Sequence, residues 1–121
     1  MTKSIALEDK FASFSEHWRP KTLAECNGQE VRIAKTQGVF PWHSHADADE
    51  LFLCWRGEFQ VEMRSHIVTL RPGELVVVPR GVEHRTMSEG EAEVLIMNMR
   101  DAVNTGDAPP SEFTAPLGVA I

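Results

Sequence analysis

The sequence contains no tyrosine and only two cysteines, Cys26 and Cys54. Without tyrosine, no phenol can act as an acid, a base or a metal ligand, so the histidines and carboxylates must carry whatever chemistry exists. The two cysteines make no disulfide framework, and neither stands in a CxxC pair of the kind that binds zinc or exchanges thiols. This cysteine content predicts a reduced, cytoplasmic protein.

Long apolar runs and basic charge are also scarce. The longest uninterrupted apolar stretch is Leu51–Trp55, whereas a membrane span needs about 20 residues and a signal-peptide core about 7 to 15. We therefore expect neither membrane insertion nor export by such a signal. Eighteen acidic residues against twelve basic ones give a net charge of -6, which disfavours nucleic acid and anionic membranes as partners. The length of 121 residues suits one domain.

The pattern changes from helical to strand-like along the chain. The N-terminal apolar stripe consists of Leu7, Phe11, Phe14 and Trp18. Its spacing predicts an α-helix that begins near Ser4 as the N-cap and ends at Pro20. Beyond it, Val31 and Ile33 alternate with Arg32 in a half-buried strand. Further strands are expected at 50–55, 59–63, 75–78 and 92–99, with 50–55 and 75–78 buried on both faces.

Short strands separated by glycine and proline favour an all-β antiparallel sandwich or barrel. After residue 100 the composition shifts to small, polar and proline-containing residues, which predicts an extended tail over 104–121. The tail could lie along the barrel, cross a partner subunit or fray. The chain is thus divided into an N-terminal helix at 1–20, a β-barrel at 21–103 and the tail.

Three histidines and one glutamate form the candidate site. His43 and His45 stand at i and i+2, so both imidazoles point to the same face of an extended segment. Glu50 lies an odd number of residues beyond His45 and would face away in an unbroken strand. Residues 46–49 are weak strand formers, so we expect a turn there and a new strand that starts at Glu50 and faces the same interior. His84 is the third imidazole.

Three imidazoles and a carboxylate suit Fe, Mn, Co, Ni or Zn, whereas Ca and Mg prefer oxygen ligands. Around an octahedral ion, four protein ligands would leave two positions open for water, substrate or O2. The H-x-H pair alone has a simpler interpretation, because an acidic loop with two surface histidines would produce the same pattern.

The spacing of these residues resembles two motifs of the cupin superfamily. The first motif has glycine, H-x-H, glutamate and glycine, and the second has glycine, P-x-G and histidine. The matching residues are Gly38, His43, His45, Glu50, Gly57, Gly73, Pro79, Gly81 and His84. Two positions depart from the pattern: Gly38 lies one residue too close to His43, and Ser88 stands where the family has asparagine.

The resemblance implies a single-domain cupin of the cupin-2 type, with a double-stranded β-helix or jelly-roll barrel. It implies that His43, His45, Glu50 and His84 bind a divalent transition metal (Fe, Mn, Ni, Co or Zn). Small barrels of this type are often described as similar to mannose-6-phosphate isomerase. That enzyme carries further domains and phosphate-binding residues, so its literal activity is not expected here. Family members are frequently homodimers, and a homodimer is expected.

Two functions follow from this interpretation, with a third alternative. The first is a small-molecule metalloenzyme, a dioxygenase or isomerase-like enzyme, whose substrate chelates the metal at an open position. Glu50 could also act as a catalytic base if it leaves the metal. The second is a non-catalytic module that binds or senses a sugar or an organic acid. The third treats the metal as a structural staple.

Other candidate residues have simpler interpretations. His66 is expected in a solvated turn, His17 on the helix surface, and Cys54 as a small apolar core residue. Trp42 and Trp55 are expected to pack. Arg80 and Arg85 flank the second motif and could meet an anionic substrate at the barrel mouth, although surface arginines beside a turn are common.

Overall fold

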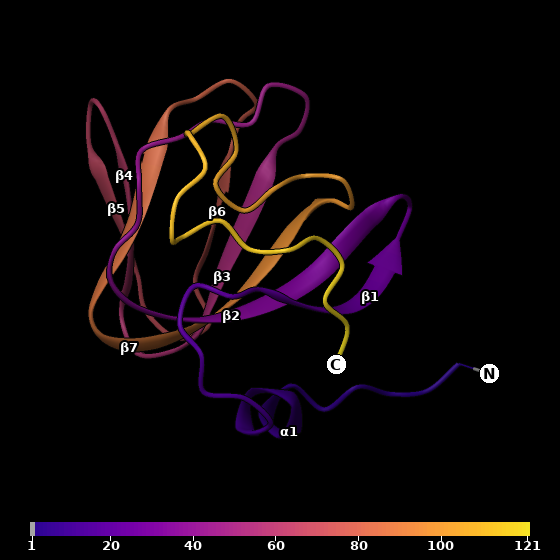
Figure 1. Ribbon diagram of the computed structural model, residues 1–121. Coiled ribbons are helices and arrows are strands. Elements are labelled where there is room, and N and C mark those ends of the chain that lie inside the picture. The colour runs from indigo at the N-terminus through magenta and orange to yellow at the C-terminus, as the bar shows by residue number, and fades with distance from the viewer. Residues whose placement is uncertain (1) are drawn as a thin grey trace.

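The computed structural model describes residues 2–121 and is built mainly of antiparallel strands, with one short helix (Figure 1). In chain order the elements are α1 (Leu7–Ala12), β1 (Lys21–Cys26), β2 (Gln29–Val39), β3 (Glu50–Arg56), β4 (Phe59–Met63), β5 (Ile67–Leu70), β6 (Leu75–Val78) and β7 (His84–Met99). This arrangement confirms the predicted all-β barrel with a short N-terminal helix. Within residues 2–121, no helix has the length and apolarity that a membrane crossing requires.

The long strand β7 joins the two sides of the barrel. Its first residues, His84–Met87, pair with β4, and its later residues pair with β2 and β3. The strand order is β1-β2-β7-β3-β6, and β4 also pairs with β5. The inward faces of these strands enclose an apolar core around Phe52, Phe59 and Val94. One strand thus connects β2 and β3 with β4 and carries His84 at its start.

The turn between β3 and β4 requires glycine. Gly57 has a positive φ of 84°, a backbone conformation that residues with a Cβ rarely adopt. A Cβ at this position would stand 2.7 Å from the carbonyl oxygen of Glu91 and 3.1 Å from Cα of Ala92. Gly57 therefore permits the close approach of this turn to β7.

The N-terminal helix is shorter than predicted. It covers only Leu7–Ala12. Its N-cap residue is Ala6, which provides no side-chain hydrogen bond, so Ser4 is not the N-cap. The hydroxyl of Ser13 donates to the carbonyl oxygen of Lys10 and ends the helix. Beyond it, Trp18 takes a left-handed backbone conformation with φ 61°, so the predicted apolar stripe is broken.

The predicted burial is also wrong for one face each of β2 and β6. Arg32 points into the barrel and is buried, because its guanidinium finds partners there. Ile33, on the opposite face of β2, is fully covered. In β6, Leu75 and Val77 are 54% and 49% exposed, so this strand is buried on one face only. Apolar residues alone do not show which face of a strand is covered.

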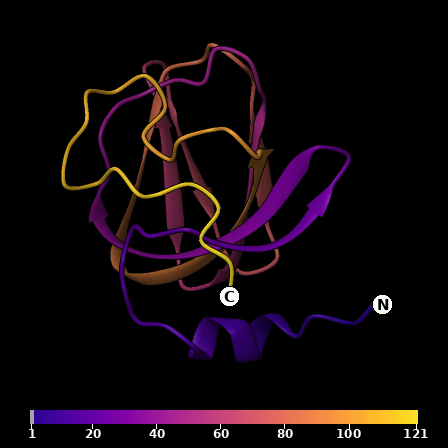
Figure 2. The same ribbon diagram turned by 45° about the vertical axis from the view of Figure 1, so that its right-hand side comes forward.

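The C-terminal segment packs on the barrel. It crosses in front of the strands and ends near β1 and α1 (Figures 1 and 2). Arg19 donates to the carbonyl oxygens of Thr114 and Glu112, and Asn104 donates to that of Phe113. The ring of Phe113 lies edge-on to Phe40, with 5.4 Å between the ring centroids. Of the predicted positions for the tail, packing along the barrel is the one observed.

Candidate metal centre

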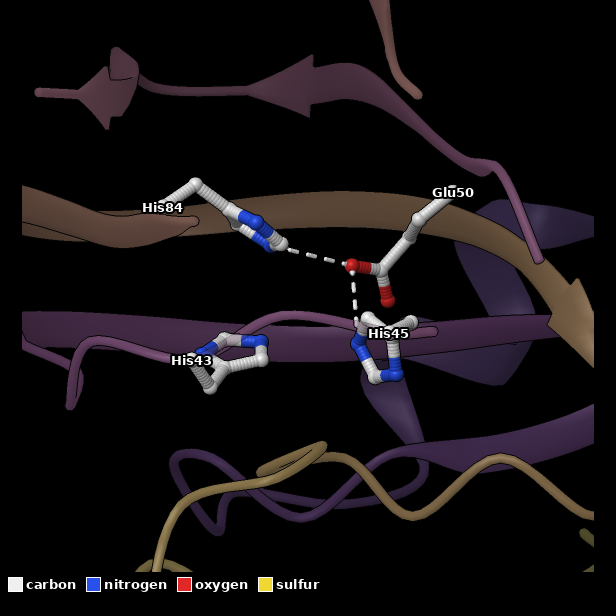
Figure 3. Close-up of side chains that lie close together, drawn as sticks. All are labelled: His43, His45, Glu50 and His84. Atoms are coloured by element: carbon white, nitrogen blue, oxygen red, sulfur yellow. Dashed lines mark hydrogen bonds and ion pairs between the residues drawn. The ribbon is translucent and has the colours of Figure 1, made fainter. Parts of the chain in front are cut away.

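Four side chains from separate segments meet inside the barrel (Figure 3). His43 and His45 lie between β2 and β3, Glu50 is the first residue of β3, and His84 is the first residue of β7. One possible ligand atom from each residue lies within 4.8 Å of those of the others, and all four residues are buried. Their arrangement could hold a single metal ion, and the alternative of two surface histidines is wrong.

Backbone hydrogen bonds bring the two motifs together. His43 and His84 form an isolated antiparallel bridge, in which each N–H donates to the other's carbonyl oxygen at 2.9 Å. The N–H of Gly81 donates to the carbonyl oxygen of His45 at 2.8 Å. The predicted turn at residues 46–49 is present, and Glu50 starts a strand that shares its buried face with Phe52 and Cys54.

The outer nitrogens of two imidazoles are fixed by the backbone. Nδ1 of His43 lies 2.8 Å from the carbonyl oxygen of Pro41, and Nδ1 of His84 lies 3.0 Å from that of Val82. A carbonyl oxygen only accepts, so each Nδ1 carries the donated proton. In the neutral rings, Nε2 is then the nitrogen with a free lone pair. This orientation of imidazoles by outer hydrogen bonds is typical of metal sites.

Glu50 is held between the imidazoles and Asn98. Its Oε1 lies 3.2 Å from Nε2 of His84, and its Oε2 accepts a 3.0 Å hydrogen bond from Nδ2 of Asn98. Nε2 of His45 lies 3.3 Å from the same Oε1, which is an ion-pair distance, but it makes no hydrogen bond there. Among the described residues it is therefore a buried nitrogen without a hydrogen-bond partner. Such an atom is costly to bury, and a metal ion among the four residues would satisfy it.

The buried charges influence each other. Burial and the neighbouring His84 lower the pKa of His43 to about 4. Burial alone would raise the pKa of Glu50, but the contacts with His45 and His84 outweigh it and lower this pKa to about 2. Burial likewise opposes charge on His84, yet the hydrogen bond and charge of Glu50, together with the hydrogen bond to the carbonyl oxygen of Val82, outweigh it and raise the pKa of His84. Glu50 is thus ionised at neutral pH. As the pH falls, protons compete with a metal ion for His84.

A cavity of about 40 Å³ adjoins the cluster. His43 and Glu50 form part of its wall. The apolar part of the wall includes Trp18, Phe40, Phe52, Phe59, Val94 and Ile96, and the polar part includes Arg32, Thr36, Thr86 and Asn104. The arrangement suits a small organic molecule with an apolar body.

Arg32 is held firmly in this wall. Its Nε donates to Glu30 at 3.0 Å, and its terminal nitrogens donate to the carbonyl oxygens of Met99, Arg100 and Ala102. Because Arg32 and Glu30 are both buried and paired, their charges largely cancel. Arg32 therefore ties the end of β7 to β2, and the charged cluster remains the main polar feature of the cavity.

The other candidate residues lie apart from the cluster. His17 pairs with Glu91 at 2.7 Å, and His66 occupies an exposed turn. Arg80 pairs with Asp49 and Arg85 with Glu62, and neither arginine lines the cavity beside the cluster. Trp42 stacks under the guanidinium of Arg64, 3.7 Å from the ring centroid, and Trp55 is 37% exposed. Cys54 belongs to the apolar core, as predicted.

Several residues of the site were not predicted from the sequence. They include Asn98, which contacts Glu50, and Arg32 and Trp18, which line the cavity. Asn98 stands at i+4 from Val94 on the inward face of β7, so the alternation of that strand is the signal that could have identified it. At the position of the missing motif asparagine, the hydroxyls of Ser88 and Thr36 form a buried 2.8 Å hydrogen bond.

Comparison with known proteins yields matches at the level of sequence and of fold. A family model described as a cupin domain matches residues 29–99. The uncharacterized protein YdbB of Bacillus subtilis (strain 168) is 32% identical over 83 residues, which cover 68% of this chain and 67% of that protein.

Two solved structures extend the comparison. A cupin-2 domain containing protein from Shewanella frigidimarina NCIMB 400 superposes with a TM-score of 0.78 at 41% identity, covering 79% of this chain and 94% of that one. Hydroquinone 1,2-dioxygenase from Sphingomonas sp. TTNP3, with 4-hydroxybenzoate bound, gives a TM-score of 0.68 at 15% identity, over 93% of this chain and 75% of that one. The second likeness concerns the fold alone.

Proposed function

Because the chain belongs to the cupin family, we propose that it is a small metal-binding cupin in which His43, His45, Glu50 and His84 hold one divalent transition metal ion (Fe, Mn, Ni, Co or Zn). The observation that carries this proposal is the convergence of their ligand atoms within 4.8 Å of one another, among which Nε2 of His45 is buried without a hydrogen-bond partner in the described residues. Imidazole nitrogen and carboxylate oxygen together suit these borderline metals.

We further propose that the protein is a small-molecule metalloenzyme, a dioxygenase or isomerase-like enzyme, whose substrate occupies the adjoining cavity. A bound metal would supply Lewis acidity or O2 activation there. The chain itself would orient the substrate against Phe52, Phe59 and Trp18, which form an apolar part of the wall. The aromatic ligand bound by the dioxygenase from Sphingomonas supports a cavity of this type as a site for a compact organic substrate.

Glu50 has two proposed roles that make different demands. As a ligand it benefits from a pKa near 2, because the carboxylate then remains ionised over the physiological range. As a catalytic base it would first have to leave the imidazoles, since a carboxylate with so low a pKa takes up protons poorly. The hydrogen bond from Asn98 holds Oε2 of Glu50 in place and would have to break as well.

A non-catalytic binding module is the alternative, and the wall of the cavity favours it in one respect. Its titratable side chains are His43, Glu50 and Arg32, and the first two belong to the cluster whereas Arg32 is paired with Glu30. General acid–base catalysis normally needs a residue free of the metal. In this alternative the cavity would hold a sugar or an organic acid without converting it.

Oxygen uptake by the metal-loaded protein distinguishes the two functions. The purified protein is loaded with Fe, Mn, Co, Ni or Zn in turn and supplied with catechols, diketones and thiols. For the oxygenase we expect metal-dependent O2 consumption with one class of substrate. Ligand-induced thermal stabilisation without turnover of any kind would contradict the enzyme and support the binding module, since a bound ligand stabilises the folded state by mass action.

We also propose a homodimer that covers the outer face of the main sheet. Cross-strand pairing sets two apolar rows side by side on this face. The first row is Val31, Met97, Leu51 and Val77, and the second is Leu95, Leu53 and Leu75 beside Ile33, which is already covered within the chain. Rows without charge on an exposed sheet face are typical of an interface.

The two free cysteines, one of them exposed, support a cytoplasmic location.

The dimer is tested by charging the two most exposed residues of these rows, which lie on β6. The double variant Leu75→Lys and Val77→Lys should sediment as a monomer in analytical ultracentrifugation, because four buried ammonium groups would be added per dimer. Ile67→Lys is the matched control, since Ile67 is 50% exposed on β5 and lies outside the two rows. A wild-type protein that sediments as a monomer would contradict the proposal.

A further inference from the structure

The segment Thr105–Asp107 of the C-terminal tail contacts the backbone between the two neighbouring histidines of the cluster. Oδ1 of Asp107 accepts a 2.7 Å hydrogen bond from the N–H of Ser44, and its Oδ2 accepts a 3.0 Å bond from the Ser44 hydroxyl. The N–H of Asp107 donates in turn to the carbonyl oxygen of Ser44 at 3.1 Å. Every polar group of Ser44 is therefore bound by this one residue.

Gly106 brings the tail into direct contact with the cluster. A Cβ at this position would collide with the carbonyl oxygen of Ser44 and stand 3.0 Å from Cδ2 of His43. The residue also has a positive φ of 53°, which favours glycine. The backbone of the tail thus packs against the edge of the His43 ring, where a side chain would keep it away.

The segment that carries His43 and His45 has few other supports. It lies outside the long strands, and its ladder contact is the single bridge between His43 and His84. The carbonyl oxygen of His45 is held by Gly81. Ser44 lies between these two points and is held by Asp107. Without Asp107, the orientation of the two imidazoles relative to each other would be less restricted.

We propose that the C-terminal tail is part of the metal centre and that Asp107 is a positioning residue, which acts on the metal through Ser44 by holding His43 and His45 in place. This inference rests on the proposed metal site. The family match ends at residue 99, so this support lies in a part of the chain that the family model does not cover. A ligand pair ordered before the metal arrives binds it more tightly, because less conformational entropy is lost on binding.

The test uses the full-length protein loaded with Co²⁺. The visible absorption bands report ligand geometry, and their decay in excess chelator gives the rate of metal loss. Loss of a residue that orients metal ligands typically weakens binding about 10–100-fold. For Asp107→Ala we expect metal loss to be faster by about that factor, with altered bands. Asp107→Asn keeps an acceptor oxygen towards the N–H of Ser44, so it should restore most of the wild-type behaviour.

Two controls separate positioning from a general loosening of the tail. Asp101→Ala removes a carboxylate from an exposed position just before the tail and should leave both readouts unchanged. Arg19→Ala frees the distal tail from its bonds to Thr114 and Glu112, and it should leave the Co²⁺ bands unchanged. Acceleration of metal loss by Arg19→Ala equal to that of Asp107→Ala would overturn the assignment to Asp107.

The outcomes also distinguish this inference from the proposed function. A wild-type protein that binds Co²⁺, together with an Asp107→Ala variant of unchanged spectrum and rate, leaves the metal site standing and refutes the role of Asp107. A wild-type protein that binds no Co²⁺ refutes both.

Ser44→Ala removes only the hydroxyl bond to Asp107 and provides a milder second variant. For this variant we expect metal loss to be faster than in the wild type but slower than in Asp107→Ala.

Discussion

Replacing His45 by alanine should reduce metal affinity by at least about 100-fold and leave the barrel folded. Four ligands together supply on the order of 10–16 kcal/mol in a structural zinc site, so the loss of one removes several kcal/mol. The fold should survive, because Nε2 of His45 makes no hydrogen bond within the described residues and the apolar core lies elsewhere. Isothermal titration with Zn²⁺ measures the affinity, and urea unfolding measures the stability.

The control for this variant is His66→Ala, which removes an exposed histidine far along the chain from the cluster. It should bind Zn²⁺ as the wild type does. Retention of full affinity in His45→Ala would contradict the proposed ligand set. Unfolding of His45→Ala, with loss of the cooperative urea transition, would instead support the structural-staple interpretation.

The convergence of the cluster could be predicted because it depends on local rules. The i and i+2 spacing of His43 and His45 places both rings on one side, and the turn at residues 46–49 returns Glu50 to the same interior. The resemblance to the two cupin motifs then added His84. These features require only the direction of each side chain and the position of turns, which sequence patterns express well.

The parts that could not be predicted depend on contacts between distant segments. Arg32 is charged, yet it points inward because Glu30 and three carbonyl oxygens near the end of β7 receive its donors. Trp18 leaves the helical stripe because its N–H and indole Nε1 donate to Lys35 and Gln37 of β2. A pattern within one segment contains no information on these partners, so propensity was overridden by tertiary structure.

Asn98 illustrates the same limit at the site itself. Its inward position follows from the alternation of β7, but its role depends on the distance to Glu50, which is 48 residues away in the sequence. Its Nδ2 donates to Oε2, while its Oδ1 accepts from the N–H of Met99. The amide is thereby fixed, and it fixes the carboxylate in turn. An orienting partner of this type affects metal binding without touching the metal.

Asn98→Ala should therefore weaken metal binding about 10–100-fold and destabilise the protein by roughly 1–3 kcal/mol, because a buried carboxylate oxygen loses its donor. The loss of this donor disfavours the ionised form, so the pKa of Glu50 should rise from about 2. Protons then compete with the metal at higher pH, and the pH midpoint of metal loss should shift upwards. Zn²⁺ titrations between pH 4 and pH 7 measure this shift.

Thr36→Val is the matched control for this effect, because it removes a buried hydroxyl that is hydrogen-bonded to Ser88 and not to Glu50. It should also destabilise the fold, since the Ser88 hydroxyl loses its partner, but the pH midpoint of metal loss should stay at the wild-type value. A common shift in both variants would mean that reduced stability alone loosens the metal. A shift confined to Asn98→Ala would instead assign the effect to the bond between the amide and the carboxylate, which places Asn98 in the outer part of the metal centre.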